Sequence, residues 1–399
     1  MACEQVTLQD VCELIVDCPH TSAKDEGVGY PLIRTPNVGR GRLILTGVHR
    51  VSQDVYERRV SRAVPRQGDL ILAREAPAGN VAIVSPGIEV CLGQRTMLLR
   101  PDSSFVVPEY LNYYLNAPEQ RDRMLRLANG ATVSHINVAD IRNMPVQLPS
   151  RGEQSKVAEL LNVLDDKIDL NNRLNDYLLE LVSSVFAHRF SNNVNTTELK
   201  NVLSISTKAL KPQEHAGEIW EHYSIPAFDE NHRPVFEPAS GIKSNKYQID
   251  SECILISKLN PSTKRIWMPY CSSNNAVCST EFIVYRPYLK EYKSFYYAAI
   301  DSPRFTDYLL EHVSGSTGSR QRAQSKDTLN YLMPNPGKEE IKDFCTFADP
   351  IYRHIQINEQ QTAKLELLRD ALLPKLMSGE IDVSKVDLTQ LTNNHLADC

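Results

Sequence analysis

Residues 153–190 of the chain read EQSKVAELLNVLDDKIDLNNRLNDYLLELVSSVFAHRF, and residues 340–376 read EIKDFCTFADPIYRHIQINEQQTAKLELLRDALLPKL. A shift of 187 residues aligns the two stretches without a gap, so that Ile168 meets Ile355 and Asn171 meets Asn358. Two unrelated core helices would not keep one fixed offset over such a length. The match therefore indicates an internal repeat.

Each stretch has the pattern of a long amphipathic helix. Each contains more than twenty consecutive residues without Pro or Gly, and its apolar residues recur at mixed spacings of three and four, as at Val157, Leu161 and Leu164. A helix over the first stretch would be roughly 55 Å long. Two helices of one register in one chain bury their apolar seams most simply against each other, as an antiparallel coiled coil. Pro374 and Gly379 should end the second helix.

Asn171 and Asn358 occupy the same position in the two seams. In one interpretation the two amides face each other across the helix pair, where a buried polar residue fixes the register at a cost in stability. In the other, the helices are rotated so that both amides lie in water. The apolar stripe changes phase near this position, and the two interpretations stay open.

The segments that precede the two stretches also resemble each other. Short apolar runs between turn residues predict a strand-rich domain, and Cys253–Ile256 in the second half corresponds to Leu70–Ala73 in the first. In the first half the expected strands are 31–33, 43–46, 69–73, 81–84 and 96–99, with helices at 109–115 and 120–127.

The expected fold class is α+β, with two pseudo-symmetric mixed α/β domains separated by two long helices that form the antiparallel coiled coil. The expected boundaries are a first domain at 1–148, a first helix at 149–191, a second domain at 192–337, a second helix at 338–381 and a polar tail at 382–399.

Composition excludes several classes of protein. The chain has 399 residues, of which 42% are hydrophobic and 23% charged, as in soluble globular proteins of two or three domains. No apolar run approaches the eighteen residues of a membrane span, and the N-terminus has no signal-peptide pattern. The nine cysteines include no Cys-x-x-Cys pair, which predicts reduced thiols in the cytoplasm and no zinc site.

Positive charge is concentrated in one region although the net charge is −5. Between Pro31 and Arg100 there are eleven arginines against five acidic residues. Such a local surplus can face a polyanion, whereas the acidic average argues against a protein that coats nucleic acid indiscriminately.

Three short motifs, set in this doubled order, resemble the specificity subunit of type I restriction–modification enzymes. They are Gly29-Tyr-Pro-Leu-Ile-Arg34, Asn129-Gly-Ala-Thr132 and Leu373-Pro-Lys-Leu-Met-Ser-Gly379. The resemblance implies that each half is a target-recognition domain for one half of a split site on double-stranded DNA, and that the helices set the gap. It also implies two adenine-methylating modification subunits and ATP-driven restriction subunits as partners. S-adenosylmethionine, ATP and magnesium would belong to those partners, and no cofactor to this chain.

The motifs that catalysis would require are missing or incomplete. Gly241-Ile-Lys-Ser244 has only the end of a phosphate-binding loop. Asn260-Pro-Ser-Thr263 begins like an adenine methyltransferase site but lacks the aromatic residue that stacks on a flipped base. We therefore expect no catalytic residues. The alternatives are a self-sufficient DNA methyltransferase or endonuclease, and a coiled-coil scaffold that does not bind DNA.

Candidate DNA contacts are cations and amides in matched loops, because Arg, Lys, Asn and Gln bond base edges while phosphates attract cations and hydroxyls. Any one of them is equally explained as a solvated surface group, but two clusters in equivalent loops favour contact. In the first domain they are Arg34, Asn37, Arg40, Arg42, Arg74, Gln94, Arg95, Thr132, Ser134 and His135. In the second they are Lys258, Asn260, Lys264, Arg265, Arg320, Gln321 and Arg322.

Overall fold

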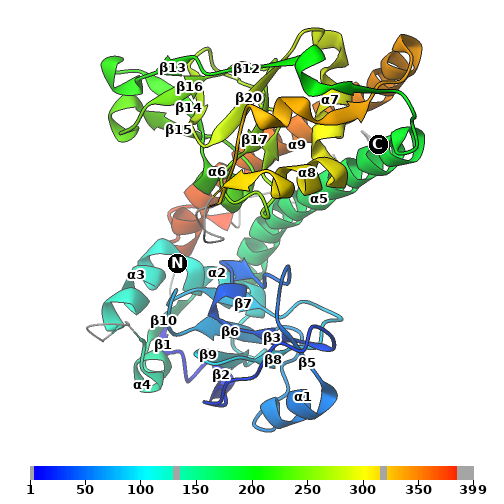
Figure 1. Cartoon of the computed structure of the whole chain (residues 1–399). Coiled ribbons are helices and arrows are strands. Elements are labelled where there is room, and N and C mark those ends of the chain that lie inside the picture. Colours follow the sequence, from blue (N-terminus) through cyan, green and yellow to red (C-terminus); the bar gives the residue numbers. More distant parts are fainter. Residues whose placement is uncertain (1–3, 129–134, 315–320, 384–399) are drawn as a thin grey trace. The chain divides into compact units, whose positions relative to one another are not determined.

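The computed structural model describes residues 4–128, 135–314 and 321–383 (Figure 1). Its contacts divide the chain into two compact units. Unit 1 comprises residues 1–168 and 364–399, and unit 2 comprises residues 169–363. Two long helices, α5 (Arg151–Phe190) and α9 (Lys338–Met377), pass from one unit into the other.

Unit 1 is organised around a five-stranded sheet in the order β2-β9-β6-β7-β4. Its strands are β2 (Cys12–Asp17), β9 (Thr96–Pro101), β6 (Leu70–Ala73), β7 (Val81–Ile83) and β4 (Gly41–Arg42). A smaller sheet contains β5 (Arg50–Val51), β3 (Tyr30–Ile33) and β8 (Cys91–Leu92), and β1 (Glu4–Thr7) pairs with β10 (Pro145–Leu148). The helices are α1 (Gln53–Arg59), α2 (Pro108–Asn116), α3 (Pro118–Leu127) and α4 (Val138–Arg142).

The centre of this sheet is buried on both faces. Leu70 and Leu72 of β6 pack in the core that contains α2 and α3, whereas Ile71 and Ala73 point into a second core on the opposite face. Burial on both sides explains why β6 reads as an unbroken apolar run rather than an alternating one.

The strand expected at 43–46 is wrong. The strand β4 lies at Gly41–Arg42, and the chain then turns. Asn37 closes this turn, because its side-chain amide donates to the Ile44 carbonyl at 3.1 Å while its own carbonyl accepts from the Ile44 N–H at 2.9 Å. Bonds within the loop thus replace the ladder bonds that a strand would need.

Unit 2 repeats the main sheet of unit 1. Its order is β12-β20-β17-β18, with β12 (Leu203–Ser206), β20 (Phe282–Pro287), β17 (Ile254–Ser257) and β18 (Ile266–Trp267) in the places of β2, β9, β6 and β7. β11 (Thr196–Glu198) pairs with β23 (Leu332–Pro334) as β1 pairs with β10. Helices α7 (Lys293–Asp301) and α8 (Pro303–Glu311) follow β20 as α2 and α3 follow β9.

The second sheet distinguishes the two units. Unit 2 has five strands where unit 1 has three, in the order β13-β16-β19-β14-β15. They are β13 (Ala209–Leu210), β16 (Lys246–Gln248), β19 (Ala276–Ser279), β14 (Ile219–Tyr223) and β15 (Val235–Pro238). The helix α6 (Ile225–Asn231) and the hairpin of β21 (Val313–Ser314) with β22 (Arg322–Ala323) complete the unit.

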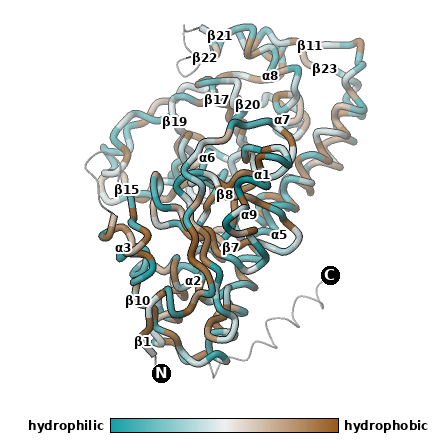
Figure 2. The backbone as a smooth tube through the Cα atoms, turned by 90° about the horizontal axis from the view of Figure 1, so that it is seen from below, coloured by the Kyte–Doolittle hydropathy of each residue, from teal (hydrophilic) through white to brown (hydrophobic). Residues whose placement is uncertain are grey.

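Each long helix has 40 residues, and hydropathy alternates along both (Figure 2). The expectation that Pro374 ends the second helix is wrong, because Pro374 lies inside α9 and the helix ends at Met377. Gly379 follows with a φ of +75°, a conformation that glycine adopts without strain. Its N–H donates to the Leu376 carbonyl at 3.3 Å and helps close the helix end.

The two helices pack antiparallel within each unit. In unit 2, Asn171 and Asn175 bond to residues 358–362 of α9, and Phe186 and Phe190 pack edge-to-face against Phe344. In unit 1, Arg369 of α9 pairs with Asp165 of α5 at 2.9 Å. Later residues of one helix thus meet earlier residues of the other throughout. The expected α+β fold with its coiled-coil helices is confirmed.

Candidate nucleic-acid interface

Three loops of unit 1 meet where β6 ends, and we call residues 74–77, 94–95 and 135–136 the unit 1 edge. Arg74 joins them through its backbone, since its N–H donates to the Arg95 carbonyl at 2.8 Å and its carbonyl accepts from the Ile136 N–H at 3.1 Å. Glu75 and His135 form a β-bridge beside these bonds. The chain thus brings together residues that lie up to sixty positions apart in the sequence.

The unit 2 edge, residues 258–261, 280–281 and 321–323, has the same backbone pattern. The Lys258 N–H donates to the Glu281 carbonyl at 2.9 Å, and the Lys258 carbonyl accepts from the Ala323 N–H at 2.9 Å. Leu259 and Arg322 form the equivalent bridge. In both units a residue with positive φ, Ala76 or Asn260, directly follows the bridge residue.

An ion pair sits on each edge, but the partner of the turn residue stands on different sides of the bridge in the two units. In unit 1 the cation, Arg95, is on the turn before β9 and its partner Glu75 is on the bridge, at 2.9 Å. In unit 2 the turn before β20 carries the acid, Glu281, and the bridge carries Arg322, at 3.0 and 3.3 Å. The two edges share a backbone and differ in the order of their charges.

The residues that begin the two edges, Arg74 and Lys258, are held differently. The Arg74 guanidinium bonds to Asp17 at 2.7 Å and to the Ile136 carbonyl at 2.9 Å, which leaves its side chain 13% exposed. At the position of Asp17, one residue beyond the end of β12, unit 2 has Thr207. No carboxylate in the described part of the chain pairs with Lys258, so its ammonium group is available to a ligand.

The loop of residues 34–42 is attached to the unit 1 edge. The Thr35 hydroxyl donates to the Ala76 carbonyl at 3.1 Å, and Gly93 lies so close that a Cβ there would be 2.7 Å from Arg34 Cγ. Asn37 is 5% exposed and also accepts from the Arg34 N–H at 3.2 Å, so its amide braces the loop.

Two further arginines of this loop differ in what they contact. Arg40 is exposed, and it has no acidic partner among the residues that the structure describes. Arg42 pairs with Asp166 of α5 at 2.6 Å. Arg40 is thus the cation of the loop that can most easily turn to a ligand.

The remaining candidates vary in how far they are already engaged. Gln94 is exposed, and its amide donates to the His20 carbonyl at 3.0 Å. Lys264 pairs with Asp301 at 2.6 Å, and Arg265 makes two bonds to Asp229, at 2.6 and 2.9 Å, with 11% of its side chain exposed. The Gln321 carbonyl accepts from the Asn260 N–H at 2.9 Å within the unit 2 edge. Thr132, Ser134 and Arg320 lie outside the described residues.

The candidate side chains thus fall into two groups, those that a ligand can reach and those that brace the loops. Arg40, Gln94, Arg95, Lys258 and Arg322 are the ones whose polar ends can reach a ligand, whereas Asn37, Arg74 and Arg265 are bonded within the protein. Sequence reasoning missed the carboxylates Glu75 and Glu281, because it looked for cations and amides alone. Their positions in the two matched clusters were a signal that could have found them.

The seam asparagines are buried rather than exposed to water. Asn171, 1% exposed, donates to Gln361 Oε1 at 3.0 Å and to Thr362 Oγ1 at 3.3 Å. Asn358, 5% exposed, donates to Asn175 Oδ1 at 2.8 Å. The amides do not bond to each other, but the shift of 187 residues converts the pair 171–362 into the pair 358–175. The two bonds therefore obey the symmetry of the repeat.

Within residues 4–128, 135–314 and 321–383, no three His, Cys, Asp or Glu side chains gather closely enough to hold a metal ion. None of the helices in those ranges is long and apolar enough to cross a membrane.

Comparison with known proteins gives consistent results. Residues 2–180 match the family model described as "Type I restriction modification DNA specificity domain". The "Type I restriction enzyme MjaIX specificity subunit" of Methanocaldococcus jannaschii is 21% identical over 374 residues, which cover 85% of this chain and 84% of that protein. The "Putative type I restriction enzyme MjaX specificity subunit" of the same organism is 25% identical over 192 residues, 47% of this chain and 45% of that protein.

A solved structure supports the fold independently. The type I restriction–modification S subunit from M. genitalium superposes with a TM-score of 0.55 at 17% identity and covers 94% of this chain and 96% of its own. At this identity the likeness concerns the fold alone. Together with the family match, these comparisons confirm the resemblance to type I specificity subunits that the sequence motifs indicate.

Proposed function

We propose that this chain, whose residues 2–180 belong to the type I restriction–modification DNA specificity family, reads a bipartite sequence on double-stranded DNA with one unit for each half-site. It has no catalytic site of its own on this proposal. It acts in the cytoplasm and positions two adenine methyltransferase subunits and the restriction subunits of the complex. S-adenosylmethionine, ATP and magnesium serve those partners.

The observation that carries the proposal is the repeated edge. The same pair of backbone hydrogen bonds holds three loops together in each unit, around Arg74 in unit 1 and around Lys258 in unit 2. A chain that folds one loop arrangement twice, on two copies of one sheet, has two equivalent surfaces for two related ligands. The two halves of a split DNA site are such ligands.

The chemistry of the edges fits base and phosphate recognition. Arginine donates two parallel bonds to guanine, and glutamate accepts from the amino group of cytosine. Each edge offers one of each in an exposed ion pair, Arg95 with Glu75 and Arg322 with Glu281. Because the donor and the acceptor stand at different positions on the two edges, the two units would read different sequences. Lys258 and Arg40 suit phosphates, which any accessible cation can contact.

The seam asparagines would contribute indirectly to assembly with the partner subunits. Asn171 and Asn358 bond across the helix pair at symmetric positions. A buried polar residue of this kind specifies register in coiled coils. We propose that they hold α5 and α9 in the one alignment on which the assembled complex depends.

Methylation assays test the proposal. The purified chain alone should neither methylate nor cut DNA, whereas the chain with its modification subunits and S-adenosylmethionine should methylate adenines at one bipartite sequence. Mapping methylated adenines in DNA from cells that carry the complete system would give that sequence. Methyl incorporation by the chain alone, free of any partner, would overturn the proposal in favour of a self-sufficient enzyme.

A further inference from the structure

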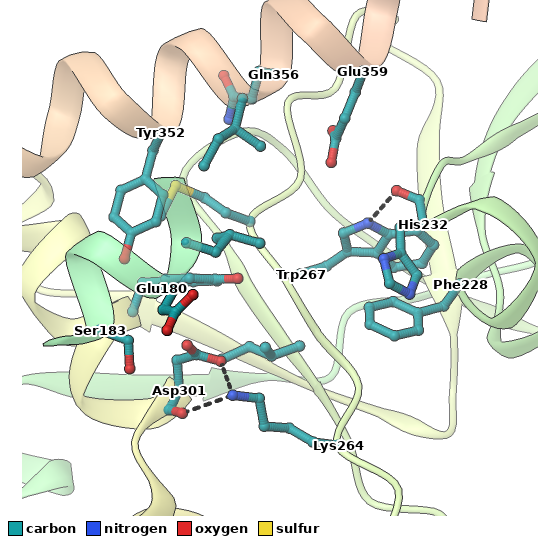
Figure 3. A pocket seen from close by; sticks show the side chains of 15 residues that line it. Glu180, Ser183, Phe228, His232, Lys264, Trp267, Asp301, Tyr352, Gln356 and Glu359 are labelled. Carbon is teal, nitrogen blue, oxygen red and sulfur yellow. Dashed lines mark hydrogen bonds and ion pairs between the residues drawn. The ribbon is translucent and has the colours of Figure 1, made fainter. Parts of the chain in front are cut away.

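Unit 2 contains a pocket of about 390 Å³ between its globular part and the two long helices (Figure 3). The aromatic rings of Trp267, Tyr297 and Tyr352 contribute to its walls, and the carboxylates of Glu180 and Glu359 enter it from α5 and α9. The indole N–H of Trp267 already donates to the His232 carbonyl at 3.1 Å. The pocket therefore presents ring surfaces together with acidic oxygens.

Glu359 is the unexplained group of this pocket. Its carboxyl group points into the cavity (Figure 3), and it has no hydrogen-bond or ion-pair partner in the part of the chain that the structure describes. Burial raises the pKa of Glu359 to about 7, and the positive charge of Arg233 opposes this rise only in part. Glu359 is half-buried, and a carboxylate that loses part of its contact with water without gaining a partner costs free energy. A cation in the pocket would remove that cost.

The repeat supplies an internal comparison. At the corresponding junction of unit 1, Glu109 of α2 lines a second pocket together with two carboxylates of α5. Both carboxylates of α5 have an arginine partner, since Asp166 pairs with Arg42 at 2.6 Å and Asp165 pairs with Arg369 at 2.9 Å. The junction of unit 2 has carboxylates as well, but the pocket there is not lined by two arginines that pair with them. Its one lysine, Lys264, is held by the Asp301 carboxylate at 2.6 Å and by the Asp301 carbonyl at 2.9 Å.

We propose that this pocket binds an organic cation, an alkylguanidinium or alkylammonium group, with Glu359 as its counter-ion. The ring faces of tryptophan and tyrosine attract such cations, and a guanidinium group donates to a carboxylate in a charge-assisted hydrogen bond. An anion does not fit, because three carboxylates and one engaged lysine line the cavity. A bare metal ion does not fit either, because no three His, Cys, Asp or Glu side chains of the described residues gather closely enough to hold one.

The binding should depend on pH through Glu359. The other charged or titratable groups that line the pocket are Glu180 of α5, His232 after α6, Lys264, Asp301 and Tyr297 of α7, and Tyr352 of α9. Arg233 and Tyr270 also interact electrostatically with Glu359. Lys264 and Asp301 are paired with each other, and burial lowers the pKa of His232, so that this ring is neutral at neutral pH. Protonation of Glu359 removes the charge that the ligand needs. Affinity should therefore rise as the pH increases through about 7 and level off above 8.

Agmatine, which carries both a guanidinium and an ammonium group, is the probe. Calorimetry with the full chain should detect saturable binding of agmatine that weakens about tenfold between pH 8 and pH 6. Glu359→Gln should lower the affinity by about tenfold or more, as expected for the loss of a charged hydrogen-bond partner. Asp343→Asn, which removes one exposed negative charge from the same helix away from the pocket, should leave it unchanged.

A second arm distinguishes a free cation from a basic side chain of a partner protein. If Glu359→Gln weakens agmatine binding and leaves assembly with the modification subunits intact, the natural ligand is a small free cation. If the substitution weakens both, the ligand is a partner's arginine or lysine. Equal agmatine binding by the wild type and Glu359→Gln, with unchanged assembly, would overturn the inference. The agmatine arm needs neither DNA nor partners, so its failure would leave the proposed function untouched.

Discussion

At the scale of single residues, a charged side chain can bind DNA only if it is not already bonded to a partner within the protein. Arg74 and Lys258 occupy the same place on the two edges, yet Arg74 is fixed by Asp17 whereas Lys258 has only Thr207 at the corresponding position. Arg74 should therefore contribute mainly to the stability of the fold, and Lys258 mainly to DNA binding. One pair of substitutions can separate these effects.

Arg74→Ala should lower the free energy of unfolding by about 1.5–3 kcal/mol, because it removes charged hydrogen bonds and leaves the half-buried Asp17 with only the Cys18 N–H and His20 as partners. Lys258→Ala should leave stability within about 0.5 kcal/mol and weaken DNA binding by the assembled complex. If Lys258 contacts a phosphate, the loss should be similar for all sequences and the salt dependence should become less steep. Lys342→Ala, on an exposed face of α9, is the control. A stable Arg74→Ala variant would show that the ion pair does not brace the edge.

Arg322 should behave differently from Lys258 because it is paired with an acid. If the pair reads a base, Arg322→Ala should cost the complex roughly 1–3 kcal/mol and relax specificity at one position of one half-site. Methylation mapping would reveal which position changes. Altered selectivity in the half-site that responds to Arg95→Ala would contradict the assignment of one unit to each half.

Glu359 gives a test of stability against pH. Its pKa is about 7 in the folded protein, above its ordinary value of 4.5, so the folded state holds the proton more tightly than the unfolded chain does. This group's contribution to stability is therefore full below pH 4.5, is lost between pH 4.5 and about 7, and stays lost at higher pH. Glu359→Gln removes the charge. Relative to the wild type without ligand, the variant should gain on the order of 3 kcal/mol at pH 8 compared with pH 4.5.

Denaturant unfolding of both proteins at the two pH values measures this difference. Asp343→Asn, at an exposed position of α9, is the control. Glu340→Gln is not suitable, because the Glu340 carboxylate accepts a hydrogen bond from the Gly337 N–H at the start of α9. A difference between variant and wild type that does not change with pH would mean that the Glu359 carboxyl group is well solvated.

At the scale of elements, the sequence was most informative where a pattern is long. Forty-residue helices carry many turns of one amphipathic period, so α5 and α9 could be predicted within a few residues of their ends. Short elements depend on tertiary bonds that no local pattern records. The turn closed by Asn37 and Ile44 replaced an expected strand, and the extra strands β14 and β15 of unit 2 gave no clear alternation.

The bond between Asn175 and Asn358 tests how the helix pair is held. Asn358→Ala should destabilise unit 2 by about 1–3 kcal/mol, because it leaves the buried Asn175 amide without its partner. Replacing both residues by leucine should be nearly neutral or stabilising, because no polar group is then left unsatisfied. Denaturant unfolding measures the two effects, and hydrogen exchange along α5 reports any change of register. If the double variant loses as much stability as Asn358→Ala, the unpaired Asn175 amide is not the cause of the loss.

At the scale of the whole molecule, the repeat in the sequence predicted the duplication of fold and edge, but not the state of each side chain. The backbone bonds around Arg74 and Lys258 follow from two copies of one topology. The acids that pair with Arg95 and Arg322 lie on other loops, and only the tertiary fold brings these loops together. A matched sequence thus gives the positions of the candidate site, and the structure determines which of them are accessible.

The length of the helix pair should set the spacer of the bipartite site, on the proposed function. Helix α5 continues unbroken through Leu170, and Asn171 faces residues 361 and 362 of α9. Four residues inserted after Leu170, together with four after Ala363 on the facing turn, would lengthen both helices at the same level. Each gains about 6 Å and turns by about 40° beyond one full turn. The paired insertion avoids the mismatch that a single insertion would leave in the seam.

Six ångströms correspond to one or two base pairs at about 3.4 Å each, and 40° is close to the twist of one base pair, about 35°. Length and rotation therefore agree on a spacer that is longer by one or two pairs, with both half-site sequences unchanged because neither edge is altered. Methylation mapping with the double-insertion variant measures the spacer directly. Paired insertion of seven residues is the comparison. It adds about 10 Å, the length of about three pairs, with almost no net rotation, whereas three pairs twist by about 105°, so this variant should not methylate a site whose spacer is three pairs longer. An active variant that still methylates the original spacing would show that the helices do not set the gap.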